Sequence, residues 1–282
     1  MPTAQDLMQT NYVSVELKDT ISSMLGKMRL KKMYYALVFE GGKYKGLIAK
    51  RFLLTSRIRP DIMKIANILK KRSKSKVPFF VPTLTPQTEL KEICRLLATA
   101  DTHILPIIKN NKVIGIVDAH DVINHIADSY KNLGCEELAS KEVIVATSND
   151  QLMKAIQKMN RNDIDHLPIV DKEGKLEGMV AMADILKNAQ FWDLHTQKIP
   201  RAASHQKGKR SGYGTGEKEN MLNLPLKNWM TTKSICSTKP STKIPEAVEM
   251  MQKNDVSNII LVQFNKPVGI MTIKNLLADY AK

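Results

Sequence analysis

The sequence predicts an α/β fold built from four copies of one β–α–β–β–α unit of about 60 residues. Three observations lead to this prediction. A glycine that opens a short, mostly apolar run recurs at Gly46, Gly115, Gly178 and Gly269. An apolar β-type run precedes each glycine, and an amphipathic helical pattern lies upstream of each β-type run. These recurrences predict a repeat protein rather than one irregular domain.

Each element of the unit has its own sequence signal. The upstream helix is clearest over 148–163, where Leu152, Ile156 and Met159 fall at helical spacing. The residues that follow each glycine-led run begin a second helix. The upstream helices are expected over 19–32, 86–101, 148–163 and 241–255, and the β-type runs over 34–39, 103–108, 166–170 and 258–262.

The spacing of the glycines divides the chain. Successive glycines are 69, 63 and 91 residues apart, so the third interval contains an insertion. The expected segments are a first repeat with a basic linker over 1–76, a second repeat over 77–136, a third over 137–190, a basic glycine-containing insertion over 191–224 and a fourth repeat over 225–282.

The unit resembles the cystathionine-β-synthase (CBS) domain family. The family pattern is an apolar–Pro–apolar strand, a turn, and then Gly–apolar–apolar–Thr/Ser–x–x–Asp before a helix; here it is carried by GIVDAHD from Gly115, GMVAMAD from Gly178 and GIMTIKN from Gly269. The resemblance implies that the repeats pair into two disc-like modules, over 1–130 and 137–282. Pairing is physically reasonable, because each small sheet has a face that a neighbour must cover.

The resemblance also implies a ligand class. CBS domain pairs bind AMP, ADP, ATP or S-adenosylmethionine in the cleft between repeats. The final Asp of the motif accepts hydrogen bonds from both ribose hydroxyls, a task that suits a carboxylate because it offers two acceptors and no donor. The Thr or Ser three residues earlier donates to the ribose or phosphate, and the strand with its Pro lines the adenine slot.

No copy in this chain has the complete Thr/Ser and Asp pair. In the second repeat Asp121 is the ribose residue, but Asp118 takes the hydroxyl position, where it would repel phosphates and tolerate uncharged adenosine. The slot strand of this repeat contains Ile104 and Pro106.

The other copies depart differently. The third repeat keeps Asp184 with Ala181 at the hydroxyl position, and its slot strand contains His166, Leu167 and Pro168. The fourth repeat keeps Thr272, but Asn275 replaces the acid and can offer the ribose one acceptor bond instead of two. The first repeat has lost both positions, to Ala49 and Phe52.

Asp121 and Asp184 have a second interpretation. Each lies close to the expected start of a helix, where a carboxylate can cap free backbone N–H groups without any ligand. The sequence leaves ligand binding and capping open as alternatives at both positions.

Basic charge is concentrated in the first quarter of the chain. The net charge is +15; residues 1–76 hold 17 Lys and Arg against 5 Asp and Glu, and residues 77–282 hold 26 against 23. This asymmetry indicates a surface for a polyanion such as RNA. The candidate contacts are Lys50, Arg51, Lys70, Lys71, Arg72, Lys74 and Lys76, with Lys207, Lys209 and Arg210 in the insertion. A membrane is the least favoured polyanion, because no basic amphipathic helix carries an aromatic face.

Other classes of protein are disfavoured. Cys94, Cys135 and Cys236 are too far apart for a disulfide framework or a zinc knuckle, so a cytoplasmic location is expected and no metal site. No catalytic motif occurs, so we expect no enzyme activity. The prediction is a regulatory protein that senses an adenosine ligand and acts on a separate partner, with homodimers common in the family. The alternative is an RNA- or ribosome-binding factor, since some archaeal CBS-domain proteins that this chain resembles in architecture and charge bind ribosomes as dormancy factors.

Overall fold

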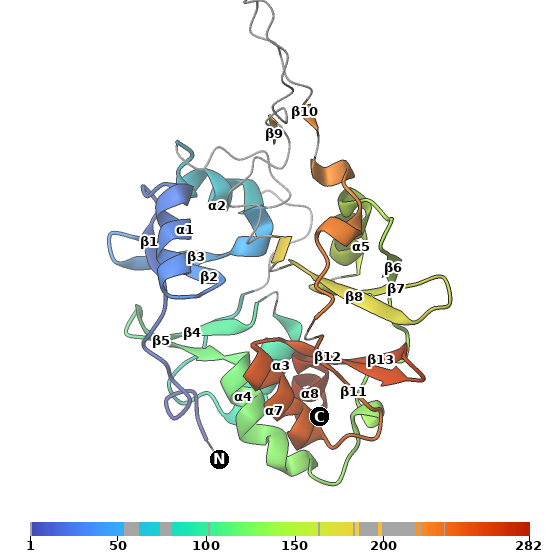
Figure 1. Ribbon diagram of the computed structural model, residues 1–282. Coiled ribbons are helices and arrows are strands. Elements are labelled where there is room, and N and C mark those ends of the chain that lie inside the picture. The colour runs from blue at the N-terminus through green and yellow to red at the C-terminus, as the bar shows by residue number, and fades with distance from the viewer. Residues whose placement is uncertain are drawn as a thin grey trace, which may run out of the picture. The chain divides into compact units, whose positions relative to one another are not determined.

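The computed structural model confirms the α/β class and the four-fold recurrence (Figure 1). We number the repeats 1 to 4 in chain order. The structure describes residues 2–53, 62–73, 81–100, 102–162, 164–182, 184–185, 197–198, 218–219, 221–233 and 235–282.

Each repeat is built around an antiparallel hairpin with a helix before it. Repeat 1 contains β1 (Ser14–Glu16), α1 (Ile21–Leu30), β2 (Tyr35–Glu40), β3 (Lys43–Ala49) and α2 (Ile65–Ser73). Repeat 2 contains α3 (Leu90–Thr99), β4 (Ile104–Lys109), β5 (Lys112–Asp118) and α4 (Ala119–Ile126). Repeat 3 contains β6 (Ala146–Thr147), α5 (Leu152–Arg161), β7 (His166–Val170) and β8 (Leu176–Ala181). Repeat 4 contains β11 (Ser237–Thr238), α7 (Ile244–Asn254), β12 (Asn258–Gln263), β13 (Lys266–Thr272) and α8 (Ile273–Tyr280), while the insertion contributes the two-residue strands β9 (Gln197–Lys198) and β10 (Lys218–Glu219).

The four glycines occupy one equivalent position in the hairpins. Each pairs with the last residue before a shift in the hydrogen-bond register of its ladder, which marks a β-bulge. The pairs are Val38 with Gly46, Ile107 with Gly115, Ile169 with Gly178, and Leu261 with Gly269. The recurrence seen in the sequence therefore corresponds to one repeated backbone geometry.

The segment that leads into a repeat crosses the hairpin of another repeat. Gln9 forms an antiparallel bridge with Ile116 beside Gly115, and Ser140 forms one with Ile270 beside Gly269. In repeat 3 the bridge joins Thr231 to Met179 beside Gly178. A side chain at Gly115 would collide with the crossing segment, because an added Cβ would lie 2.7 Å from the backbone oxygen of Gln9.

The chain divides into two compact units that do not follow the order of the repeats. One unit contains residues 1–143 and 236–282, and the other contains residues 144–235. The segment that leads into repeat 3 therefore belongs to the first unit, together with repeat 4. The segment that leads into repeat 4 belongs to the second unit, together with repeat 3.

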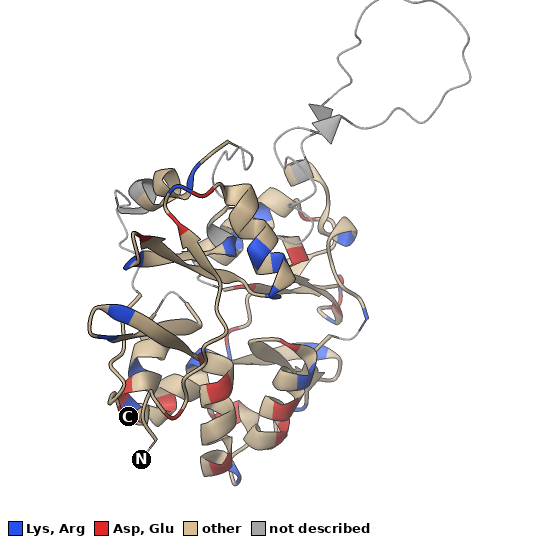
Figure 2. Cartoon of the chain, turned by 90° about the vertical axis from the view of Figure 1, so that its left-hand side faces the viewer, with Lys and Arg blue, Asp and Glu red and all other residues tan. Residues whose placement is uncertain are grey.

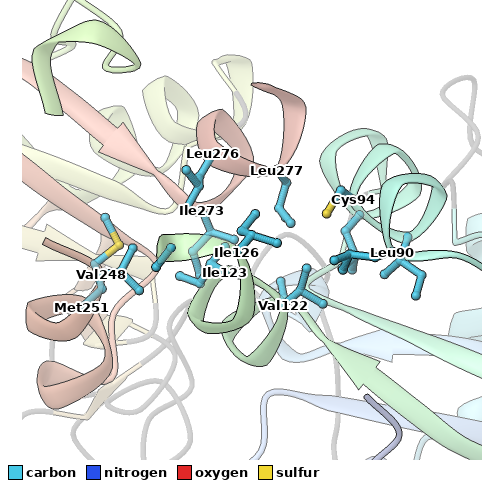
Figure 3. Close-up of a cluster of buried hydrophobic side chains, with 14 of the residues drawn as sticks. Leu90, Cys94, Val122, Ile123, Ile126, Val248, Met251, Ile273, Leu276 and Leu277 are labelled. Carbon is cyan, nitrogen blue, oxygen red and sulfur yellow. The ribbon is translucent and has the colours of Figure 1, made fainter. Parts of the chain in front are cut away.

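Repeats 2 and 4 share a core within the first unit. Apolar side chains of α3, α4, α7 and α8 are buried against one another (Figure 3). Figure 3 shows Ile123 and Ile126 of α4 between Leu90 and Cys94 of α3 on one side and the α7 residues on the other. The amphipathic pattern of each helix is satisfied by this contact, because each helix buries one apolar stripe.

Candidate functional site

The motif residues lie where the second strand of each hairpin runs into the next helix. In repeat 2 the last residue of β5, Asp118, is the N-cap of α4, and the backbone N–H of His120 donates to its Oδ1 at 2.8 Å. Asp121 lies three residues after Asp118, inside the first turn. The capping interpretation of Asp121 is therefore wrong, since the cap is the residue at the hydroxyl position of the motif.

Asp118 is partly buried, with other acidic residues near it. Burial raises the pKa of its carboxyl group, and the charges of Asp121 and Asp255 raise it further. The hydrogen bond from the His120 backbone and the charge of His120 act in the opposite direction. Carboxylates from repeats 2 and 4 therefore influence one another at this point, which is unfavourable for a phosphate.

Asp121 is engaged by the N-terminal segment of the chain. The side-chain amide Nε2 of Gln9 donates a hydrogen bond to Asp121 Oδ2. The backbone holds Gln9 in place, because its N–H donates to Ile116 O at 2.8 Å and its carbonyl accepts from Ile116 N at 2.9 Å. The carboxylate that the family uses for ribose is thus bonded to this chain's own glutamine.

The hairpins of repeats 1 and 2 pack together through apolar residues. Leu37, Leu47 and Ala49 of repeat 1 form a buried cluster with Ile104 and Ile116 of repeat 2. Ile104, a predicted slot residue, is 6% exposed in this cluster, and Pro106 is buried in the same strand. Aromatic residues also meet here, because the Tyr35 hydroxyl accepts a hydrogen bond from the backbone N–H of His103 at 3.3 Å.

In repeat 4 the two motif residues are bonded to each other. The Thr272 hydroxyl accepts from the backbone N–H of Asn275 at 3.2 Å, and Asn275 Oδ1 accepts from the backbone N–H of Thr272 at 2.8 Å. This reciprocal arrangement is a capping box at the start of α8. The amide oxygen of Asn275 also accepts from the Thr272 hydroxyl at 2.6 Å, so both side chains serve the helix terminus.

Repeat 3 differs from repeat 4, because its motif acid, Asp184, does not form a capping box. Residues 182, 184 and 185 are helical, so Asp184 lies in the first turn of a helix rather than at its N-cap. Among the described residues, no hydrogen bond to the Asp184 carboxylate is present. The capping interpretation therefore also fails at Asp184, and its partly exposed carboxylate remains able to accept hydrogen bonds.

The hairpin that precedes Asp184 contains the predicted slot residues of repeat 3. His166 pairs with Ala181 across the ladder, and Leu167 and Pro168 are buried in the same strand. Burial lowers the pKa of His166, although the charges of Asp165 and Asp184 oppose this shift. Asp184 and His166 are therefore close enough to interact electrostatically, as the sequence prediction of a common site requires.

Sequence reasoning missed the residues of the crossing segments. Thr231 exchanges backbone hydrogen bonds with Met179 at 2.8 and 2.9 Å, and Thr231, Thr232 and Lys233 are exposed. Gln9, which crosses the hairpin of repeat 2, was missed in the same way. One feature of the sequence could have identified these segments, because Met8 precedes Gln9 and Met230 precedes Thr231. Both methionines contact the motif glycine of the hairpin that they cross.

The predicted nucleic-acid contacts fall into three groups. Lys50 is only 7% exposed, and its Nζ lies 5.6 Å from the centroid of the Tyr34 ring, so it is not an open surface charge. Arg51 lies in a 3₁₀ turn (Lys50–Leu53), and Lys70, Lys71 and Arg72 lie in α2. The remaining candidates, Lys74, Lys76, Lys207, Lys209 and Arg210, lie outside the described residues.

Helix α1 carries exposed basic residues. It lies within residues 1–76, where the sequence predicts a surface for a polyanion. Lys27, Arg29, Lys31 and Lys32 are all exposed at or beyond the C-terminal half of α1, and the colouring of Figure 2 shows the basic character of the chain here. Two apolar side chains accompany them, because Leu30 is 83% exposed and Tyr34 is 43% exposed.

Two kinds of feature are absent from the described ranges. No group of three or more His, Cys, Asp and Glu side chains there is arranged to hold a metal ion. None of the helices in those ranges is long and apolar enough to cross a membrane.

Comparison with known proteins gives relatives that match all or part of the chain. A protein of Thermofilum pendens, described as an uncharacterized 33.4 kDa protein in ribosomal RNA operon, is 24% identical over 264 residues, which cover 90% of this chain and 81% of the relative. Inosine-5'-monophosphate dehydrogenase of Thermoplasma acidophilum is 30% identical over 123 residues, which cover 44% of this chain but 24% of the enzyme. The crystal structure of protein MJ1225 from Methanocaldococcus jannaschii superposes with a TM-score of 0.75 at 21% identity, covering 99% of this chain and all of MJ1225.

A family model identifies three of the four repeats. The model of the CBS domain matches residues 76–128, 135–190 and 226–282, which is more than half of the chain. Repeat 1 lies outside the matched ranges, although its hairpin has the same glycine and bulge, and its motif positions are Ala49 and Phe52. The chain belongs to the CBS domain family.

Proposed function

We propose that this protein is a regulatory protein that binds an adenosine-containing ligand at repeat 3 and passes the information to a separate partner molecule. The observation that carries the proposal is the hydrogen bonding of the Asp184 carboxylate. Of the motif polar groups, Asp118 caps a helix, Asp121 is bonded to Gln9, and Asn275 completes a capping box. Among the described residues, Asp184 caps no helix and accepts no such hydrogen bond.

The chemistry of the surroundings suits a nucleoside. A carboxylate accepts from two vicinal hydroxyls without supplying a competing donor. His166 is favoured in its neutral form by burial, so it adds no fixed positive charge beside a neutral base. Ala181 cannot donate to a phosphate, but Thr231 and Thr232 supply exposed hydroxyls on the segment paired with β8. AMP, ADP, ATP and S-adenosylmethionine are the candidate ligands.

Calorimetric titration with these ligands tests the proposal. The variant Asp184→Asn keeps the shape of the side chain and removes its charge, and Glu177→Gln removes one exposed negative charge from the same hairpin as a matched control. We expect Asp184→Asn to weaken binding at least about tenfold, since hydrogen bonds to charged groups contribute about 1.5–3 kcal/mol each. Glu177→Gln should bind as the unmodified protein does. Equal affinity of both variants, or no heat with any of the ligands, would remove the proposal.

A second candidate function is RNA binding by repeat 1. The exposed basic residues of α1, with Tyr34 and Leu30 beside them, support it, because basic surfaces with exposed aromatic side chains suit phosphate contacts and base stacking. The relative from Thermofilum pendens, described as a protein in a ribosomal RNA operon, is consistent with an RNA partner.

Binding to ribosomal RNA at increasing salt tests this candidate. The slope of log K against log salt should be about 0.9 per phosphate contact on duplex RNA and smaller on single strands. The double variant Arg29→Ala/Lys32→Asn should flatten the slope; Asn is chosen because Lys32 has φ 54°, which Asn tolerates. The control Lys154→Ala/Lys172→Ala removes two exposed lysines from repeat 3 and should not change it. Equal slopes for the two double variants would reject repeat 1 as the RNA surface.

A further inference from the structure

The site of repeat 2 contains a donor from the chain itself. Gln9 Nε2 bonds to Asp121 Oδ2 across 112 positions of sequence. The primary amide of Gln9 has two N–H donors, and the ribose of a nucleoside also presents two donors to the motif acid. The glutamine amide and a ribose therefore offer the same kind of group to the same carboxylate.

The position of Gln9 is fixed by its backbone. Its antiparallel bridge to Ile116 has both hydrogen bonds, and Met8 lies so close to Gly115 that a Cβ there would be 2.4 Å from Met8 Cγ. Further towards the N-terminus, Ala4 is fully buried, and its N–H donates to Thr88 O at 2.8 Å. The segment that carries Gln9 is thus anchored at Gln9 itself and on its N-terminal side.

The two donors exclude one another at Asp121 Oδ2. A ribose that is to bond both of its hydroxyls to the carboxylate must replace the Gln9 amide, and the backbone bridge can remain while the side chain rotates away. The neighbouring carboxylates of Asp118 and Asp255 make the same place unfavourable for phosphates.

We propose that Gln9 closes the repeat 2 site and restricts it to phosphate-free adenosine compounds that can displace its side-chain amide from Asp121. This inference rests on the proposed function, because it assumes that the family's ligand chemistry applies to this chain. It adds a second, gated site, and it makes the Gln9 side chain the group that reports occupancy to the N-terminal segment.

Adenosine is the probe for the test, and the Asp184→Asn background silences the repeat 3 site. Calorimetry compares Asp184→Asn alone, the same chain with Gln9→Ala, and that double variant with Asp121→Asn added. We expect Gln9→Ala to tighten adenosine binding roughly ten- to hundredfold, the range expected when a competing hydrogen bond to a charged group is removed. The addition of Asp121→Asn should abolish the gain. Thr10→Ala, which removes an exposed neighbouring side chain, should leave the affinity unchanged.

The result that overturns the inference is an equal affinity for adenosine with and without Gln9, or a gain that persists after Asp121→Asn. Failure of the proposed function is seen separately, as equal ligand binding by the unmodified protein and Asp184→Asn. If Gln9→Ala does not fold, the side-chain amide resonance of Gln9 in the Asp184→Asn protein gives a second measurement. It should shift when adenosine is added to millimolar concentration, and an unchanged resonance also overturns the inference.

Discussion

Substituting Gly115 by alanine tests how the lead-in segment of repeat 1 is fitted to repeat 2. The new Cβ would lie 2.4 Å from Met8 Cγ and 2.7 Å from the backbone oxygen of Gln9. The methionine side chain can rotate, but the backbone oxygen must retreat by about 0.7 Å to reach ordinary contact at 3.4 Å. That movement would stretch the two hydrogen bonds between Gln9 and Ile116, which are now 2.8 and 2.9 Å long.

The expected loss of stability follows from these contacts. Weakening two backbone hydrogen bonds and overpacking the crossing should lower the free energy of unfolding by about 1–3 kcal/mol. Urea denaturation followed by far-UV circular dichroism measures the loss, and hydrogen exchange of the peptide 2–12 shows whether it is local. Gly26→Ala in α1 is the matched control: no atom lies within 4 Å of its added Cβ, so it should stabilise by about 0.5–1 kcal/mol. A Gly115→Ala protein as stable as the unmodified chain, with unchanged exchange over 2–12, would refute the reasoning.

Two further predictions concern helix starts. Thr272→Ala removes one half of the capping box of α8 and should destabilise the protein by about 1 kcal/mol in urea denaturation, whereas Thr272→Ser should not. Burial raises the pKa of Asp118 above its ordinary value of 3.8, so the native state holds this proton more tightly than the unfolded state, and stability falls as the pH rises through the interval between the two pKa values. Asp118→Asn retains an acceptor for the His120 N–H and cannot titrate, so its stability relative to the unmodified chain should rise as the pH increases above the ordinary carboxyl pKa of 3.8; a constant difference would contradict this.

The repeated hairpins could be predicted from local sequence. Gly46, Gly115, Gly178 and Gly269 follow β-type runs at similar distances, and all four occupy the same place beside a bulge. Such patterns are readable because the apolar period and the glycine requirement arise within a single hairpin. The equivalence of the repeats, and with it the family, followed from these positions.

The contacts between repeats could not be read in the same way. Gln9 and Asp121 are 112 residues apart, and no periodicity links them. Which of two carboxylates caps α4 also depends on where β5 ends: the chain begins the helix at Ala119, so Asp118 rather than Asp121 is the cap. The sequence alone predicted carboxylates at these motif positions but not the groups of this chain that contact them.

Repeat 1 shows a similar limit. Its basic composition predicts a polyanion surface in this region, but charge counts do not distinguish exposed lysines from buried ones. Lys50 lies under 10% exposed beside Tyr34, whereas Arg29, Lys31 and Lys32 are exposed. Since a surface contact with a polyanion requires accessible charge, α1 is a better place for mutagenesis than Lys50.

Native mass spectrometry of the intact chain with a single adenosine ligand tests the central claim most directly. Among the described residues, Asp184 is the one motif carboxylate that neither caps a helix nor accepts a hydrogen bond from this chain, so we predict one bound AMP per chain in the unmodified protein and none in Asp184→Asn under the same conditions. Ligand counts that are the same in both proteins, whether zero or one, would contradict the account.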